Sequence, residues 1–277
     1  MRPHVQPAPR RRQALHSLVA PFCVTAFLLS APGYIEAALT ELRSHDAPAV
    51  VRAVTGPAAE QPRADDRVEF SDYENFVANP TGSQISFTRL SDGYHTGSAT
   101  ERYPRPALSL SKLFIADYVL DHGTPEEREQ ALAMIRSSDD DFADELYEKY
   151  PDSITSVATE YGLWSTRASE DGWGYSVTSM YDMVKYLKAK IENEPRSPLL
   201  QAMKQADRTA ADGYTQDFGT SVLPGAAGTK WGWSNDLLLH SSISFGDDYV
   251  VAVAVMGSAE DLTALVKHRV EPLLAGK

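Results

Sequence analysis

The strongest constraint on the fold lies in the last third of the chain, where three apolar runs follow one another closely. They span residues 229–233, 237–245 and 249–256, and each is rich in branched or aromatic side chains. The connections between them, at Ser234-Asn235 and at residues 246–248, are only a few residues long. Because such short connections can join only antiparallel strands, the pattern predicts an antiparallel sheet.

The rest of the chain predicts what surrounds this sheet. Residues 84–90 and 94–98 flank a Ser-Asp-Gly turn, which indicates a hairpin. Helical patterns fill the middle of the chain, and one more closes it. They cover residues 110–120, 125–136, 139–150, 153–161, 177–192, 198–206 and 260–274. We therefore predict a two-lobed α/β fold: an antiparallel sheet of about five strands flanked by helices, with an inserted all-helical lobe.

The N-terminal region has a different composition. Three arginines at positions 10–12 precede a mostly apolar run over residues 14–35, and small residues follow it at Ala37 and Ala38. This layout predicts a secretory signal over residues 1–37, or else an N-terminal membrane anchor through residues 14–35. Residues 38–66, rich in Ala, Pro and charge, indicate a flexible linker, and residues 67–277 form the predicted domain. We expect an exported protein of a bacterial cell envelope.

Charge and composition exclude several classes of function. The chain of 277 residues has a formal net charge of −12, and removing residues 1–37 makes the remainder more acidic still. An acidic surface disfavours nucleic acid and anionic lipid as partners. The seven histidines are scattered without zinc-ligand spacing, and the one cysteine, Cys23, lies in the apolar N-terminal run. We therefore predict no metal, no cofactor and no thiol chemistry.

A serine and a lysine stand where the helix predicted over residues 110–120 begins. Leu110, Leu113 and Phe114 form its apolar face, and Ser109 and Lys112 are three residues apart. Residues at this spacing share one face of a helix. At the N-terminus of the helix, the free backbone N–H groups add positive potential. Ser109 could therefore be a nucleophile activated by Lys112. The alternative is ordinary helix capping by the serine and a solvated lysine.

Two further short motifs follow in sequence. Ser138-Asp139-Asp140 lies between two predicted helices, where a side-chain hydroxyl can point into a cleft. Lys230 and Gly232 lie in the first strand of the C-terminal set, where the glycine lets a substrate approach the backbone closely. The structural alternatives are an acidic helix-capping cluster and a solvated strand lysine.

Together these residues resemble the signature of serine β-lactamases and penicillin-binding proteins, which reads Ser-x-x-Lys, then Ser-Asp-Asn, then Lys-Thr-Gly. The resemblance covers about residues 67–277. It implies that Ser109 is acylated, that Lys112 is the activating base and that Ser138 passes a proton to the leaving group. It further implies that Lys230 favours a substrate carboxylate. The substrate-binding set that it implies is Asp140, Lys230, Trp231, Gly232 and Trp233, with the N–H groups of Ser109 and Trp233 forming an oxyanion hole.

Several positions depart from the family pattern. Asp140 replaces the usual Asn, and an ionised acid cannot donate a hydrogen bond to a substrate. Trp231 replaces the usual Thr or Ser, so we expect a changed or excluded substrate there. Glu170 lies in the region of the deacylating glutamate, but its surroundings do not resemble that motif. Efficient β-lactam hydrolysis is therefore not expected.

Three functional hypotheses follow. The first is a serine hydrolase-like protein that transfers the acyl group of a small peptide or peptidoglycan-like amide through Ser109. The second is a binding or scaffold protein of the cell envelope that kept the fold and lost the chemistry, as Asp140 and Trp231 suggest. The third and weakest is a β-lactamase.

Overall fold

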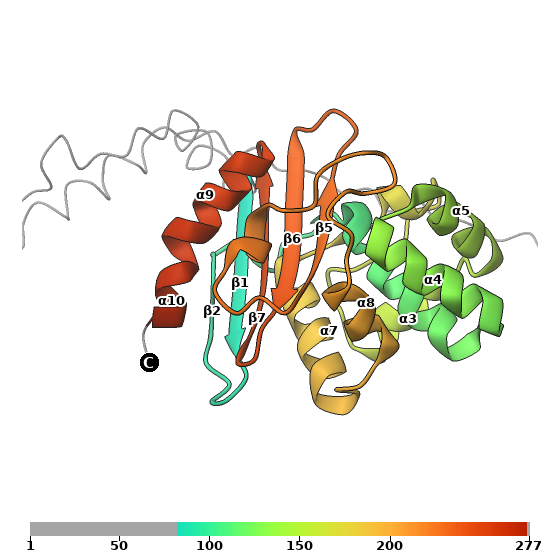
Figure 1. The fold of residues 1–277 in the computed structure, drawn as a ribbon, viewed down its shortest axis with the longest axis horizontal. Helices are drawn as coiled ribbons and strands as arrows, with labels where there is room; N and C mark the ends of the chain where they lie inside the picture. The colour runs from blue at the N-terminus through green and yellow to red at the C-terminus, as the bar shows by residue number, and fades with distance from the viewer. Residues whose placement is uncertain (1–81, 276–277) are drawn as a thin grey trace, which may run out of the picture. The chain divides into compact units, whose positions relative to one another are not determined.

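The computed structural model describes residues 82–275. Its centre is a sheet of five antiparallel strands, as predicted, and their order is β2-β1-β7-β6-β5 (Figure 1). The strands are β1 (Ser83–Arg89), β2 (His95–Gly97), β5 (Gly228–Trp233), β6 (Leu239–Phe245) and β7 (Tyr249–Met256). Because β1 pairs with β7, the two ends of the described chain close one sheet, and β5 forms its edge.

The helical region comes between β2 and β5 in sequence, as predicted, and lies on one side of the sheet (Figure 1). It consists of α3 (Lys112–His122), α4 (Pro125–Ser137), α5 (Asp140–Lys149), α6 (Ser153–Glu160), α7 (Met180–Asn193) and α8 (Pro198–Lys204). Side chains mark where these helices begin. Thr124 forms a capping box with Glu127 at α4, and Asp139 caps α5 by accepting a hydrogen bond from the N–H of Phe142.

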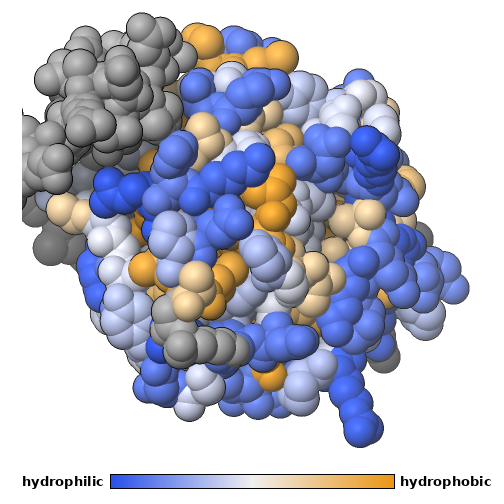
Figure 2. All heavy atoms as spheres, turned by 60° about the vertical axis from the view of Figure 1, so that its left-hand side comes forward, coloured by the Kyte–Doolittle hydropathy of each residue, from blue (hydrophilic) through white to orange (hydrophobic). Residues whose placement is uncertain are grey.

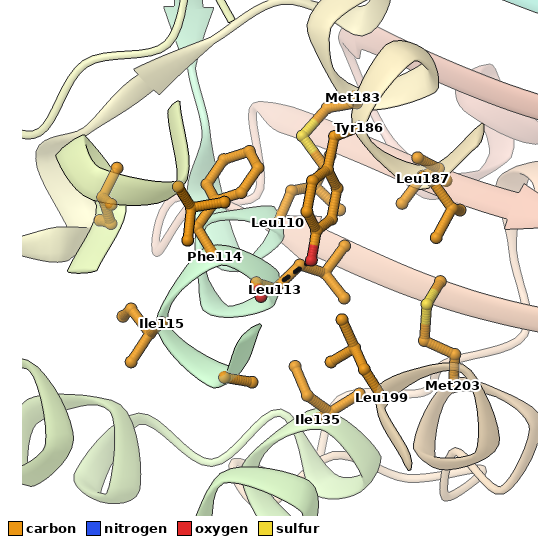
Figure 3. Packing of buried hydrophobic residues seen from close by; sticks show 14 of the residues in the cluster. Leu110, Leu113, Phe114, Ile115, Ile135, Met183, Tyr186, Leu187, Leu199 and Met203 are labelled. Carbon is orange, nitrogen blue, oxygen red and sulfur yellow. Dashed lines mark hydrogen bonds between the residues drawn. The ribbon is translucent and has the colours of Figure 1, made fainter. Parts of the chain in front are cut away.

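Two hydrophobic cores occupy the two faces of the sheet, and β7 shows why. Its side chains alternate, so that Val250, Ala252 and Ala254 join the core under the helices. Its other residues, such as Val251 and Val253, join the core under α9 (Ala259–Arg269). The first core gathers around α3, where Leu110, Leu113 and Phe114 pack near Tyr186 of α7 (Figure 3). Its packing fixes the start of α3, and Ser109 with it.

Some boundaries differ from the prediction. The expected closing helix over residues 260–274 is two helices, α9 and α10 (Glu271–Ala275). A small second sheet, β3 (Arg105–Pro106) with β4 (Val177–Thr178), was not predicted, because two-residue strands carry no periodicity. Ser109 lies in a short 3-10 helix, η2 (Leu108–Leu110), one turn before α3 and not in its first turn.

The face of the molecule on the α9 side is mostly hydrophilic, with scattered apolar side chains (Figure 2). Among residues 82–275, no helix combines the length and apolar character needed to span a membrane. The predicted signal or anchor over residues 1–37 and the predicted linker over residues 38–66 lie outside the described residues.

Candidate functional site

Ser109 lies where the helical region meets the edge of the sheet. The residue before it, Leu108, has a left-handed backbone with φ of 54°, and the hydroxyl of Ser111 donates to the Leu108 carbonyl at 2.7 Å. Only 8% of Ser109 is exposed, yet it lines a cleft of about 480 Å³. Among the described residues, the hydroxyl of Ser109 has no hydrogen-bond partner. A hydroxyl so placed is accessible to a ligand from one side only.

Lys112 begins α3 beneath this cleft, with none of its side chain exposed. Its Nζ donates to the Ser138 carbonyl at 2.6 Å and to the carboxylate of Asp140. The same ammonium lies 4.8 Å from the ring centre of Trp173. Burial lowers the pKa of Lys112, and the charge of Asp140 opposes that shift. Lys112 is thus paired with Asp140. Within residues 82–275, Lys112 makes no hydrogen bond with Ser109.

Ser138 connects the two lysines of the predicted site. It is the C-cap of α4 and has a left-handed backbone, with φ of 57°, which turns the chain from α4 into α5. Its carbonyl accepts from Lys112, and its Oγ accepts from Lys230 Nζ at 2.6 Å. The helix-capping interpretation is confirmed for Asp139, while the predicted catalytic role of Ser138 stays a prediction. Asp139 caps a helix, while Ser138 and Asp140 bind the lysines.

Lys230 extends from β5 and is fully buried. Besides Ser138 Oγ, its Nζ donates to the carbonyl of Trp231 at 3.1 Å. Burial, together with the nearby positive charge of Lys112, lowers the pKa of Lys230 well below its usual value. The three motifs are thus joined by hydrogen bonds, although Lys112 and Lys230 are 118 positions apart in sequence.

Gly232 brings β5 directly against Ser109. A Cβ at this position would lie 2.9 Å from the Leu108 Cβ and 3.1 Å from the Ser109 nitrogen, so no side chain fits. The N–H of Ser234 donates to the carbonyl of Leu239, which lies in β6. Backbone N–H groups of successive residues in a strand point to opposite sides, so the N–H of Trp233 points away from β6, towards the outer edge of β5. The N–H of Ser109 belongs to a first helical turn, which has no intrahelical acceptor for it. Trp233 and Ser109 both line the cleft.

Of the predicted site residues, Ser109, Asp140 and Trp233 line the cleft, whereas Lys112, Ser138, Lys230, Trp231 and Gly232 do not. Trp231 differs from the others because its side chain belongs to the core under α9. Its indole N–H donates to the Phe218 carbonyl at 2.8 Å, and its ring is buried in the core under α9. Neighbouring side chains on a strand point to opposite faces, so Trp231 points away from the side of Lys230. Trp231 is not among the residues that line the cleft, which corrects the expectation that its indole meets a substrate.

Sequence reasoning missed most of the cleft wall. The loop before η3 (Trp173–Tyr175) contributes Asp171, η3 itself contributes Trp173 and Tyr175, and α5 contributes Asp144. Asp236 comes from the turn between β5 and β6. The glycines at 172 and 174 indicated a loop, but only the fold shows what it covers. Glu170 does not line the cleft, and among the described residues no group of His, Cys, Asp and Glu could hold a metal ion.

Comparison with known proteins agrees with this geometry at the level of the fold. No protein-family model matches the sequence, and no curated protein matches it. Solved structures do match. TLA-3 extended-spectrum β-lactamase has a TM-score of 0.56 and 16% identity, over 74% of this chain and 97% of that one. A β-lactamase from Burkholderia vietnamiensis has a TM-score of 0.55 and 15% identity, over 73% and 97% of the two chains. Penicillin-binding protein D2 from Listeria monocytogenes, solved with bound cefotaxime, has a TM-score of 0.54 and 16% identity, over 71% and 98%. The chain therefore has the fold that β-lactamases and penicillin-binding proteins share.

Proposed function

We propose that this protein is a serine acyl hydrolase or acyltransferase that acts through Ser109. The observation that carries the proposal is Ser109, which is 8% exposed, lines the cleft and has a hydroxyl without a partner among residues 82–275. Two buried lysines, which Ser138 joins, lie on the neighbouring elements α3 and β5. A hydroxyl that makes no hydrogen bond with the described residues is available for chemistry. The fold, shared with enzymes that acylate a serine, supports the same proposal.

The reaction would proceed in two balanced steps. Ser109 Oγ attacks an acyl carbon, a bond forms between Oγ and that carbon, and the bond from the carbon to the leaving nitrogen or oxygen breaks. The neutral amine of Lys112 takes the serine proton. The hydroxyl of Ser138 gives a proton to the leaving group and regains one from Lys230. Water or an amine then attacks the ester carbon and gives a proton through Ser138 to Lys230, while the bond from that carbon to Ser109 Oγ breaks and Oγ regains its proton from Lys112. The N–H groups of Ser109 and Trp233 would stabilise the oxyanion.

The substrate that we propose is a small peptide or related amide of the cell wall, in an exported protein. Rapid β-lactam hydrolysis is not part of the proposal, because Glu170 does not line the cleft. Turnover of the chromogenic cephalosporin nitrocefin tests this point directly. Fast turnover that depends on Ser109 would favour the β-lactamase hypothesis instead.

One observation favours a second candidate, a binding or scaffold protein without turnover. Lys112 donates to the Asp140 carboxylate, and this ion pair favours the protonated amine, which cannot take the serine proton. Under this hypothesis peptidoglycan fragments bind to the cleft and are released unchanged. A chromosomal Ser109→Ala variant would then keep the cellular role.

Covalent labelling separates the two candidates. We expect a fluorescent penicillin or a fluorophosphonate to add its mass to Ser109 of the wild-type protein, as intact-mass and peptide mass spectrometry would show. Ser109→Ala should not be labelled. Ser137→Ala, which removes the hydroxyl next to Ser138 that donates to the Ala133 carbonyl, is the matched control and should be labelled like the wild type. Absence of labelling in correctly folded wild-type protein with both probes would overturn the enzymatic proposal.

A further inference from the structure

The wall of the Ser109 cleft is acidic and aromatic. Three aromatic side chains line it, and its charged lining residues are all acids. The aromatic residues are Trp173, Tyr175 and Trp233, and the acids are Asp140, Asp144, Asp171 and Asp236. No Lys or Arg is among the described residues that line it. Carboxylates next to aromatic faces are the surroundings that bind organic cations.

Two of these carboxylates are available at the cleft. Asp140 is paired with Lys112, and Asp144 accepts a hydrogen bond from the indole N–H of Trp173 at 2.6 Å. Asp236 is held in the β5–β6 turn by the hydroxyl of Ser234 at 2.5 Å and by the N–H of Leu238 at 3.1 Å. These hydrogen bonds lower the pKa of Asp236, so it stays ionised at neutral pH. Asp171 lies in the loop before η3, on a different segment of the wall from Asp236.

Unlike the carboxylates, the two lysines of the site, Lys112 and Lys230, are not exposed to a ligand. Lys112 and Lys230 have no exposed surface, and each is bound to Ser138. The side chain of Trp231, which stands where a hydroxyl would be expected to help bind a carboxylate, points into the other core. A substrate carboxylate entering this cleft would therefore meet like charge and find no exposed cation. Ser109, buried and unpartnered among the described residues, marks where the acyl carbon would lie.

We propose that the cleft selects acyl donors that carry an ammonium group and rejects those that carry a carboxylate at the same end. This inference rests on the proposed acyl transfer through Ser109. The ammonium would lie against Asp171 and Asp236 and over the aromatic side chains of the wall. The substrate class is therefore a cationic acyl donor, such as a peptide or amide with a free amine on the acyl side.

The test uses three 4-nitrophenyl hexanoates of matched shape, whose far ends carry a trimethylammonium, a tert-butyl or a carboxylate group. Acylation of Ser109 releases 4-nitrophenolate as the ester bond to Oγ forms. We expect kcat/KM for the trimethylammonium ester to exceed that for the tert-butyl ester by about fivefold or more at low salt, with the carboxylate ester slowest. The preference should shrink as NaCl is added, because about 0.1 M salt screens charges beyond about 10 Å.

Variants test whether the acidic residues of the cleft wall cause the preference for the trimethylammonium ester. Asp171→Asn combined with Asp236→Asn should reduce the ratio of trimethylammonium to tert-butyl rates to about one. Asp121→Asn, an exposed change at the far end of α3, should leave that ratio at the wild-type value. A wild-type ratio of one, a faster carboxylate ester, or a ratio unchanged in the double variant would each overturn the inference.

A binding measurement separates this inference from the proposed function. The corresponding hexanoate methylamides, which cannot release nitrophenolate, are titrated into Ser109→Ala protein while the fluorescence of the cleft tryptophans is followed. Tighter binding of the trimethylammonium amide supports the inference even if no ester acylates the wild type, an outcome that would overturn acyl transfer alone. Equal or weaker binding of that amide overturns the inference even if Ser109 is acylated.

Discussion

Asp140 opposes the effect of burial on the pKa of the proposed base, Lys112. It stands where the family pattern has a neutral amide, and its carboxylate pairs with the fully buried Lys112. Burial lowers the pKa of Lys112, while the negative charge of Asp140 raises it. Only the neutral amine can take the proton of Ser109, so the two effects act on the rate in opposite directions.

The first prediction concerns Asp140→Asn. Removing the carboxylate lowers the pKa of Lys112 further, so the rising limb of the pH–rate profile should move to lower pH. The acylation rate at pH 7 should rise about tenfold for each unit by which the pKa falls. Time-resolved mass spectrometry of Ser109 acylation between pH 5 and about 10 measures it. Asp141→Asn, an exposed neighbour in the same helical turn, is the control. Slower acylation by Asp140→Asn would show that Asp140 itself assists the reaction.

The second prediction concerns Gly232, where β5 meets η2. In Gly232→Ala the new methyl group would lie 2.9 Å from both the Leu108 Cβ and the Ser241 Oγ, and neither is the end of a long flexible chain. We expect a loss of about 1–3 kcal/mol in the free energy of unfolding, together with displacement of Ser109 from β5. Gly174→Ala is the matched control, because a Cβ there meets nothing within 4 Å. Equal stabilities in urea unfolding would contradict the close approach.

At the scale of elements, a buried ion pair ties α3 to α7. Lys190 Nζ lies 2.6 Å from Asp117 Oδ1, with side-chain exposures of 3% and 6%. Burial opposes the charge of Lys190, but hydrogen bonds to Asp117 and Glu194 outweigh it and raise the pKa of Lys190. Because α3 also carries Lys112, this pair helps to fix the helix that positions the site.

The third prediction follows from that pair. Among residues 82–275, Asp117→Ala leaves the buried Lys190 with Glu194 as its one acidic partner, and Glu194 is half-exposed. We therefore expect destabilisation of about 3 kcal/mol. Glu192→Gln, which breaks the surface pair between Lys188 and Glu192 on the same helix, should cost at most about 1 kcal/mol. Chemical unfolding of both variants measures the difference. Similar costs would show that burial adds nothing to the α3–α7 pair.

The elements themselves could be predicted well from local signals. The proline at position 125 and the capping box of Thr124 place the start of α4, and apolar runs with short connections gave the order β5, β6, β7. The two-residue strands β3 and β4 could not be predicted, because their pairing depends on contacts between distant segments. The left-handed Leu108, a rare conformation for a branched side chain, also carried no sequence signal.

At the scale of the whole molecule, the order of the motifs predicted that Lys112, Ser138 and Lys230 meet, and they do. Sequence could not show that Lys112 pairs with Asp140, because 28 positions separate the two residues and only the fold brings them together. The sequence could not show which face of the sheet Trp231 points to. Because β5 is buried on both faces, its residues do not alternate between polar and apolar. The acidic wall comes from three separate segments, so only the folded chain brings Asp144, Asp171 and Asp236 together.

The fourth prediction belongs to the whole chain. If residues 1–37 act as a cleaved signal, the exported protein should begin near Ala38, and intact-mass analysis of the secreted or envelope fraction would show it. The same protein held in the cytoplasm by a secretion block is the control and should keep residue 1. An envelope form that retains residues 14–35 would support the membrane anchor instead.

Ser138 and Ser109 differ in the hydrogen bonds that they make within the fold. Ser138 accepts hydrogen bonds from two buried ammonium groups, so replacing it would leave Lys230 without its side-chain acceptor. Ser109 supplies no hydrogen bond from its hydroxyl within residues 82–275. If the proposed acyl transfer were present and then lost, genetic drift would therefore treat the two serines differently. Selection for folding alone would preserve Ser138, whereas only selection for chemistry would preserve Ser109 among descendants of this gene.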